Sequence, residues 1–586
     1  MPPLIPALLF CALAAYSNAD LREGRAFLFM DEQISVDEAL WLFSATSFGD
    51  LLFRIVHGQD LRYGQIFHVA SAAVAHLPYR WWGEPGLIVA IRMWNAALLA
   101  AAYVVFGWAA LRTTAARVAA ITLACLLPSS AYYSTVPKPE PMQLLCLSIA
   151  MLLLVRRRRA DFWPWFFVGL GFGAKISTLP ALAVLACISF VLDRSQAPAL
   201  TAPRPLAAMR LLLSIVALGM GAAVLGYEER FGIVARVLLG GMLIVLGLSF
   251  ALLRARVDAR LALHPHLLRW LGRAGSFLTG FFVAVPCVIA FFPVRTQNWF
   301  GSTFLNTTHG ADDSAVGPLA WLRFIFTGWS DAPALVVGLV ATGTLLAVGL
   351  FLASECRTRV AHADVVTGPL AFLAAGAALG ASIVLSVHRV WDFYLHPAAV
   401  FVLFGAAAVL ERLGSSPRER RLALAVVAGW SALGLGDLLP AALRKHDALA
   451  HRTATAAFVA KRAQLDAVTS FVDARQAALG RPIAVLLTPD LFQPQSTRLV
   501  TYTRFWGHDV EWQGPYAVLV VLRSGAPGGP ALSPSSREYE AQRRYWREWE
   551  QHVSPEGSCR EPPCYRVRAD VSDGEILVLE RVDDPA

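Results

Sequence analysis

The chain has 586 residues, of which 56% are hydrophobic and only 16% are charged, whereas about 25% of the residues of an ordinary soluble protein are charged. Its formal net charge of +9 lies largely in short basic clusters between apolar runs, a pattern that sets membrane topology and does not indicate a nucleic-acid partner. The composition therefore excludes an ordinary soluble enzyme. It predicts a helical membrane domain over residues 1–440, followed by a soluble domain over 441–586.

Apolar runs predict thirteen membrane-spanning helices, at about 3–17, 86–108, 115–133, 141–155, 162–174, 177–192, 209–226, 231–253, 275–293, 333–353, 367–386, 394–411 and 421–440. In this arrangement all the basic loops fall on one side of the membrane, including "RRRR" at 156–159 and the stretch from Arg254 to Arg273. The positive-inside rule assigns that side to the cytoplasm. We therefore expect a cytoplasmic N-terminus and an external C-terminal domain. The alternative for residues 1–17 is a cleaved signal peptide.

The first external segment, 18–85, begins with two pairs of acids, Asp31 with Glu32 and Asp37 with Glu38. The sequence "SVDE" from Ser35 to Glu38 matches a capping box, so the second pair is expected to begin an interfacial helix.

A second amphipathic run, at 64–78, ends at Pro78 and is followed by Tyr79, Trp81 and Trp82. Because the span at 86–108 enters from outside, this run is expected to lie along the membrane interface with its aromatic residues at headgroup level. The alternative is that 64–82 crosses the membrane, which would invert the topology.

Three later external segments combine charge with apolar surroundings: "PKPEPMQLL" at 137–145, "GLGFGAKISTLPAL" at 169–182 and "HRVWDFYLHPAAV" at 388–400. A lone Lys175 between two apolar helices needs an anion or access to water, and the guanidinium of Arg389 is suited to holding a phosphate with two parallel hydrogen bonds. A longer external loop, at 294–332, contains "HGADD" and is interpreted as a lid. Its one His and two Asp are a weak indication of a metal.

Taken in order, the acidic opening, the interfacial runs and these motifs resemble the GT-C glycosyltransferases over residues 1–440, in the branch of the protein O-mannosyltransferases and the lipid A aminoarabinose transferases. The resemblance implies a sugar donor linked to polyprenyl phosphate and a hydroxyl acceptor on a lipid, glycan or protein. It also implies an active site on the external face of a bacterial inner membrane. It makes Asp31 the general base, with Glu32 beside it. The residues that contact the donor phosphate are Lys175, Arg389, Tyr394 and Arg62. The residues that position the acceptor or a divalent metal ion are Glu140, Lys138 and His388.

A carboxylate is needed because a hydroxyl is a poor nucleophile at neutral pH. The resemblance implies an inverting sugar transfer. It assigns no cofactor and leaves open whether a divalent metal ion takes part. Two alternatives remain open: a ligase that uses diphosphate-linked donors, and a transporter or flippase for lipid-linked sugars. A transporter would carry more charge within its spans, where Arg92 is the main exception.

The C-terminal domain is predicted to be a small α/β domain, with a helix at 447–478 and strands at 483–488, 516–522 and 575–580. Cys559 and Cys564 stand alone in this domain, in "CREPPC". Because an external domain lies in an oxidising compartment, we expect a disulfide between them.

Overall fold

The computed structural model describes residues 2–18, 30–57, 64–156, 162–195, 265–290, 368–386, 392–412, 434–451, 454–488, 497–504, 514–523 and 561–583, with scattered short pieces between them. The described chain is mostly helical with one small sheet. It divides into two compact units, which are described separately. The first comprises Met1–Ala26, Asp31–Thr308 and Val316–Ala450, and the second comprises Phe27–Met30, His309–Ala315 and His451–Ala586.

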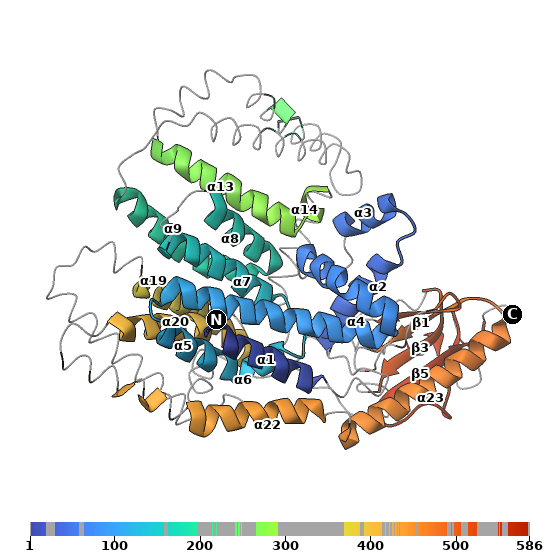
Figure 1. The fold of residues 1–586 in the computed structure, drawn as a ribbon. Coiled ribbons are helices and arrows are strands. Elements are labelled where there is room, and N and C mark those ends of the chain that lie inside the picture. Colours follow the sequence, from blue (N-terminus) through green and yellow to red (C-terminus); the bar gives the residue numbers. More distant parts are fainter. Residues whose placement is uncertain are drawn as a thin grey trace. The chain divides into compact units, whose positions relative to one another are not determined.

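The helices of the first unit are α1 (Leu4–Ser17), α2 (Met30–Phe43), α3 (Phe48–His57), α4 (Gln65–Ala110), α5 (Thr114–Leu126), α6 (Pro128–Tyr133), α7 (Glu140–Met151), α8 (Phe162–Ala174), α9 (Leu179–Ser195), α13 (Pro265–Ala284), α14 (Cys287–Ala290), α19 (Pro369–Ser386), α20 (Asp392–Arg412) and α22 (Leu439–Ala450). A π-helical turn, Leu152–Arg156, follows α7, and another, Gly434–Leu438, precedes α22. Helices α4, α7, α8 and α13 follow one another side by side (Figure 1). A single apolar core joins α1, α4, α5, α7, α8, α9, α19 and α20.

Helix α4 unites the predicted interfacial run and the predicted span that follows it, and it bends sharply between them. Pro78 does not end the first half, as the sequence analysis expected, because the helical backbone continues to Gly83. Gly83 has φ +64° and ψ −149°, a conformation that is essentially restricted to glycine. The bend brings the two halves together so closely that a Cβ atom at Gly86 would lie 2.3 Å from the carbonyl oxygen of Pro78.

Two other local predictions are wrong. Ser35 does not cap a helix, because α2 begins at Met30 and the sequence "SVDE" lies inside it, with the Ser35 and Glu38 side chains buried. The predicted cytoplasmic loop up to Arg273 is partly helical, because α13 begins at Pro265. The guanidinium of Arg273 is buried 4.8 Å from the ring centroid of Trp270, where the aromatic face offsets its loss of water.

Only some of the thirteen predicted spans can be compared with described helices. Within the described ranges, Pro85–Ala110 and Tyr394–Arg412 are long and apolar enough to cross a membrane. Six further apolar helices of 10–17 residues coincide with other predicted spans: Leu4–Ser17, Thr114–Leu126, Glu140–Val155, Phe162–Ala174, Pro180–Ser189 and Pro369–Val384. The spans predicted at 209–226, 231–253, 333–353 and 421–440 lie wholly or largely outside the described residues.

The first and last helices of this unit are held together by side-chain hydrogen bonds. The Tyr16 hydroxyl donates to Asp447 Oδ1 at 2.7 Å, and the Ser17 hydroxyl is hydrogen-bonded to Nδ1 of the buried His446. Because α22 packs on α1 in this way, the first unit ends after Ala450 and not after residue 440, where the sequence analysis placed the boundary.

The second unit is a mixed sheet packed against α23 (Ala456–Leu479). Its strands are β1 (Ile483–Leu487), β2 (Val500–Arg504), β3 (Tyr516–Leu522), β4 (Tyr565–Val567) and β5 (Ile576–Arg581), in the order β2-β1-β3-β5-β4. Strands β2, β1 and β3 are parallel, and β5 and β4 continue the sheet in antiparallel pairs. Thr455 caps the start of α23 through its hydroxyl, and Gly480, with φ +63°, ends it. A disulfide joins Cys559 and Cys564.

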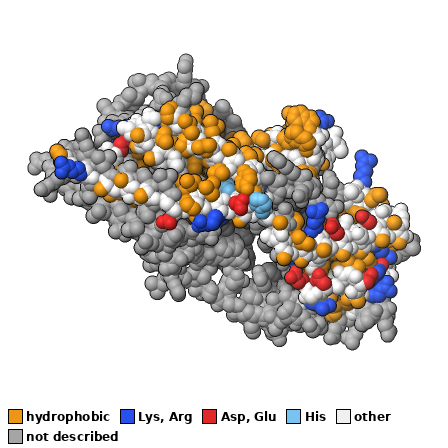
Figure 2. Space-filling view, turned by 60° about the horizontal axis from the view of Figure 1, so that its bottom comes forward, with side chains coloured by type: hydrophobic (Ala, Val, Ile, Leu, Met, Phe, Trp, Pro, Cys, Tyr) orange, Lys and Arg blue, Asp and Glu red, His pale blue; other side chains and the backbone are white. Residues whose placement is uncertain are grey.

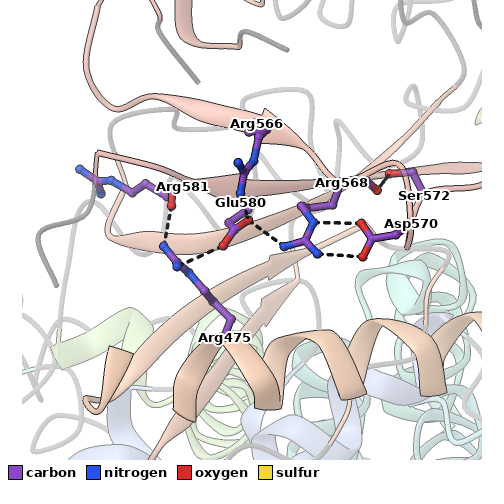
Figure 3. A network of polar contacts seen from close by, with 7 residues as sticks. All are labelled: Arg475, Arg566, Arg568, Asp570, Ser572, Glu580 and Arg581. Carbon is purple, nitrogen blue, oxygen red and sulfur yellow. Dashed lines mark hydrogen bonds and ion pairs between the residues drawn. The ribbon is translucent and has the colours of Figure 1, made fainter. Parts of the chain in front are cut away.

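One buried carboxylate, that of Glu580 on β5, ties β4 and β5 to α23 (Figure 3). Its Oε1 lies 3.1 Å from Arg475 Nη1 of α23, and its Oε2 lies 3.1 Å from Arg566 Nη2 and 2.9 Å from Arg568 Nη1. Arg568 also forms two hydrogen bonds with Asp570, and Arg475 donates to the carbonyl oxygen of Arg581. Burial raises the pKa of the Glu580 carboxyl, but hydrogen bonds from Arg568 and Arg566 and the nearby charge of Arg475 outweigh burial and lower the pKa overall.

Candidate functional site

The structure describes the side chains of four of the nine residues to which the sequence analysis assigned catalytic, phosphate-binding or positioning roles. Arg62, His388 and Arg389 lie outside the described residues, and Asp31 and Glu32 are described only as backbone in the first turn of α2. Tyr394, near the start of α20, packs half-buried against the main core. The remaining three, Lys138, Glu140 and Lys175, lie close to the ends of α7 and α8.

Glu140 and Lys175, which are 35 positions apart in the sequence, form an ion pair. The Lys175 ammonium donates to Oε1 of Glu140, whose side chain is 3% exposed, while the Lys175 side chain is 20% exposed. The sequence analysis expected Lys175 to meet a lipid phosphate. The anion that it meets in the structure is a carboxylate of the protein itself.

The backbone around Lys175 explains how its ammonium is aimed at α7. Helix α8 ends at Ala174, and a 3-10 turn, Ile176–Thr178, leads into α9. Thr178 donates from its backbone N–H and from its hydroxyl to the carbonyl oxygen of Lys175. The amide of Gln143, one turn after Glu140 in α7, donates to the hydroxyls of Ser177 at 3.0 Å and Thr178 at 2.8 Å. Helix α7 therefore holds both the carboxylate and the turn that carries its cationic partner.

The start of α4 closes the same region from another side. The backbone N–H of Gly64 donates to the carbonyl oxygen of Ala174 at 3.3 Å. A Cβ atom at Gly64 would lie only 2.3 Å from the carbonyl oxygen of Gly173, so this contact requires glycine. The next residue, Gln65, is buried and accepts a hydrogen bond from the backbone N–H of Cys287 at 3.4 Å. The N-termini of α4 and α7 and the C-terminus of α8 therefore meet around Lys175.

Two polar features of this region are chemically unusual. The Lys138 side chain is 2% exposed, and its ammonium lies 5.6 Å from the ring centroid of Tyr132, a distance at which a cation is attracted to the aromatic face. The second carboxylate oxygen of Glu140, Oε2, is buried and has no hydrogen-bond partner among the residues that the structure describes. Because leaving a buried charged acceptor unpaired is costly, this oxygen is suited to receive a hydrogen bond from a ligand hydroxyl.

The described side chains do not form a metal site. Among them, no three His, Cys, Asp or Glu side chains are close enough together to hold a metal ion. Glu140 lies beside Lys175 and two positions from Lys138 in the sequence. The positive charges of these two lysines oppose the binding of a divalent cation at Glu140. The positioning of a divalent ion by Glu140, Lys138 and His388 remains a prediction, because His388 lies outside the described residues.

Sequence reasoning missed a buried polar network between α4, α6 and α20. His396 lies between Ser129, whose Oγ is 2.7 Å from Nδ1, and Tyr103, whose hydroxyl is 2.9 Å from Nε2. The sequence analysis chose His388 from the same motif. The signal that marks His396 is its spacing from Val400 and Phe404, because residues four apart share one face of a helix and all three are fully buried.

Arg92, the one charge that the sequence analysis placed well inside a span, is also fully buried, and its Nη1 donates to Asn18 Oδ1 at 2.9 Å. Its position links α4 to the residue that follows α1.

No protein-family model matches the chain, and no curated protein matches it.

Proposed function

We propose that this chain is an integral membrane glycosyltransferase of the GT-C type. It transfers a sugar from a polyprenyl-phosphate donor to a hydroxyl acceptor at the external face of a bacterial inner membrane. The observation that carries this proposal is the cluster at adjoining helix ends of the buried Lys138 and Glu140 with the partly exposed Lys175. It offers both a cation for a phosphate and an unsatisfied carboxylate oxygen for a hydroxyl.

The outer surface of the helices supports a membrane location. Helix α1 exposes Ile5 at 56%, Leu8 at 67% and Leu9 at 61%, which in water would be an unusual apolar face for one short helix. The space-filling view shows hydrophobic side chains gathered over part of the described surface, with few charged groups among them (Figure 2). Trp81 and Trp82 are also exposed, at 66% and 67%, as expected for residues at headgroup level. That the whole chain crosses the membrane thirteen times remains our proposal.

In the proposed reaction a carboxylate accepts the proton of the acceptor hydroxyl while that oxygen attacks the anomeric carbon of the sugar. The bond from the anomeric carbon to the phosphate oxygen breaks, and its electron pair leaves with the polyprenyl phosphate. We assign the proton to Asp31 and the phosphate to Lys175, Arg389, Tyr394 and Arg62. Glu140, with Lys138 and His388, positions the acceptor.

The experiment that tests this proposal is mass spectrometry of the envelope glycolipids and glycoproteins of a strain that lacks the gene. We expect one glycan to lose a single sugar, and the sugar to return with the wild-type gene but not with Asp31→Asn. An unchanged set of glycans, with the lipid-linked sugar accumulated on the cytoplasmic side, would instead support the flippase alternative.

A further inference from the structure

We propose that Gln143 is a positioning residue of the donor site. Its side-chain amide does not act on the donor. It fixes the turn that carries Lys175, and through that turn it holds the ammonium at the place where the donor phosphate binds. This inference rests on the proposed function and adds to it a residue to which the sequence analysis gave no role.

The amide of Gln143 is fully buried and is bonded to one turn of the chain. Its nitrogen carries two hydrogens and lies 3.0 Å from the Ser177 hydroxyl and 2.8 Å from the Thr178 hydroxyl. The Ser177 hydroxyl also lies 3.4 Å from the amide oxygen. Each hydrogen therefore has an acceptor within the protein, and the amide joins α7 to the 3-10 turn that follows Lys175.

The hydroxyl of Thr178 passes this restraint on to Lys175. A hydroxyl donates one hydrogen and accepts through its lone pairs. Here it accepts from the Gln143 amide and donates to the carbonyl oxygen of Lys175 at 2.9 Å. The backbone N–H of Lys175 donates to the carbonyl oxygen of Gly171 at 3.0 Å, in the last turn of α8. The backbone of Lys175 is thus held from both sides, so its side chain starts from a fixed point.

These polar bonds are not needed to pack α7 against α8. The two helices already share an apolar cluster that contains Met142, Cys146 and Ala174. A buried hydrogen bond adds little stability beyond the cost of removing its partners from water, so an apolar residue at position 143 would serve packing as well. The amide adds a defined geometry, because Glu140 lies three positions before it on the same face of α7. One helix therefore places both the carboxylate and the turn of its cationic partner.

A fixed turn matters for Lys175 because its side chain is long. A lysine ammonium is a point charge on a flexible four-carbon stem, and holding such a group in place before a ligand arrives lowers the cost of binding. Without the amide or the Thr178 hydroxyl, the ammonium should leave Glu140 more often. Its contact with a phosphate should be weaker for the same reason.

The test compares Thr178→Val, which removes the hydroxyl and keeps the shape of the side chain, with Thr178→Ser, which keeps the hydroxyl. Gln143→Met removes the amide at nearly the same length. Ser148→Ala is the matched control, because it removes a buried hydroxyl of α7 that donates to Leu145 in the same helix. All variants are studied as the full chain in lipid nanodiscs.

The first measurement is the rate at which an amine-reactive ester acylates Lys175, followed by mass spectrometry of the peptide that contains it. Thr178→Val and Gln143→Met should raise this rate about 2- to 12-fold, the factor that corresponds to one neutral hydrogen bond. Thr178→Ser and Ser148→Ala should keep the wild-type rate. The second measurement is the affinity for a short polyprenyl monophosphate, which should fall by a similar factor in the first two variants alone.

Wild-type acylation rates in Thr178→Val and Gln143→Met would overturn the positioning role and leave the proposed function intact. Thr178→Ser that behaves like Thr178→Val would also overturn it, since the hydroxyl would then not be the cause. Faster acylation with unchanged affinity for the monophosphate would overturn the role in donor binding. If Thr178→Val does not fold, Gln143→Met against Ser148→Ala decides the same questions. A wild-type protein that does not bind the monophosphate would overturn the proposed function, and the acylation rates would still decide whether Gln143 positions Lys175.

Discussion

Replacing Glu580 by Gln tests whether one carboxylate holds the second unit together. The substitution keeps the size of the side chain but removes the negative charge that faces Arg475, Arg566 and Arg568. The three arginines do not lose the same amount of stabilisation. Arg568 keeps its two hydrogen bonds to Asp570, and the Arg566 side chain is 45% exposed and can be hydrated.

The cost therefore comes mainly from Arg475, whose side chain is only 19% exposed. Loss of this half-buried ion pair should cost about 1.5–3 kcal/mol, a value between those for exposed and for fully buried ion pairs. If β4 and β5 open as a unit, the same free energy appears as roughly 10- to 150-fold faster amide hydrogen exchange in those strands.

The assay is hydrogen exchange of the full chain, followed by mass spectrometry of the peptides that contain β4 and β5. Asp570→Asn is the matched control, because its carboxylate is exposed and its loss should change exchange little. Exchange in Glu580→Gln that equals the wild-type rate would show that the three arginines are held without this carboxylate.

Acid should have the same effect as the substitution. The pKa of Glu580 is lowered in the folded chain, so its stabilisation is complete above the ordinary pKa of a glutamate. It is lost as the pH falls through the lowered value. Protease susceptibility of β4 and β5 should therefore rise on acidification in the wild type and rise less in Glu580→Gln. Equal rises in both proteins would assign the acid effect to other groups.

Three further predictions concern the topology of the chain and two residues of the first unit. A reporter fused after Ala586 should be active only outside the cytoplasm, and activity inside would contradict the proposed topology. Asp31→Asn should lower turnover of the lipid-linked donor about 10²- to 10⁴-fold, the usual contribution of a general base. Asp50→Asn, which removes an acid paired with Arg54, is the control, and full activity of Asp31→Asn would mean that another residue is the general base. Gly83→Ala should lower stability by about 1–3 kcal/mol, because a residue with a Cβ atom is strained in this backbone conformation, although no atom lies within 4 Å of the added Cβ. An unchanged unfolding temperature would show that the bend relaxes.

The elements that the sequence predicted well are those with strong local signals. Strands β1 and β3 are continuous apolar runs and β5 begins with one, and the structure places all three within a residue or so of the prediction. Strand β2, "VTYTR", is half polar, and β4 has only three residues, so neither stands out from a loop. The start of α2 was missed because a good capping sequence, from Ser35 to Glu38, lies inside the helix.

The candidate site was predictable residue by residue but not as a pair. Glu140 and Lys175 each stood out as a charge among apolar residues, yet nothing local links two positions on different helices. Their contact depends on how α7 packs against α8 and on the Gln143 hydrogen bonds that fix the turn. The same limitation explains the boundary at Ala450, since the charged sequence of α22 looks soluble until α1 is placed beside it.

The hydrogen bonds between α1 and α22 also have a consequence for biosynthesis. Ser17 and His446 are separated by 429 positions, and a chain emerges from the ribosome N-terminus first. The first helix therefore leaves the ribosome long before α22 exists, and it lacks this partner until almost the whole helical unit has been translated. A chain that ends before α22 would retain most of its helices, but α1 would lack its hydrogen bonds to α22. A quality-control protease could recognise an α1 that is exposed in this way.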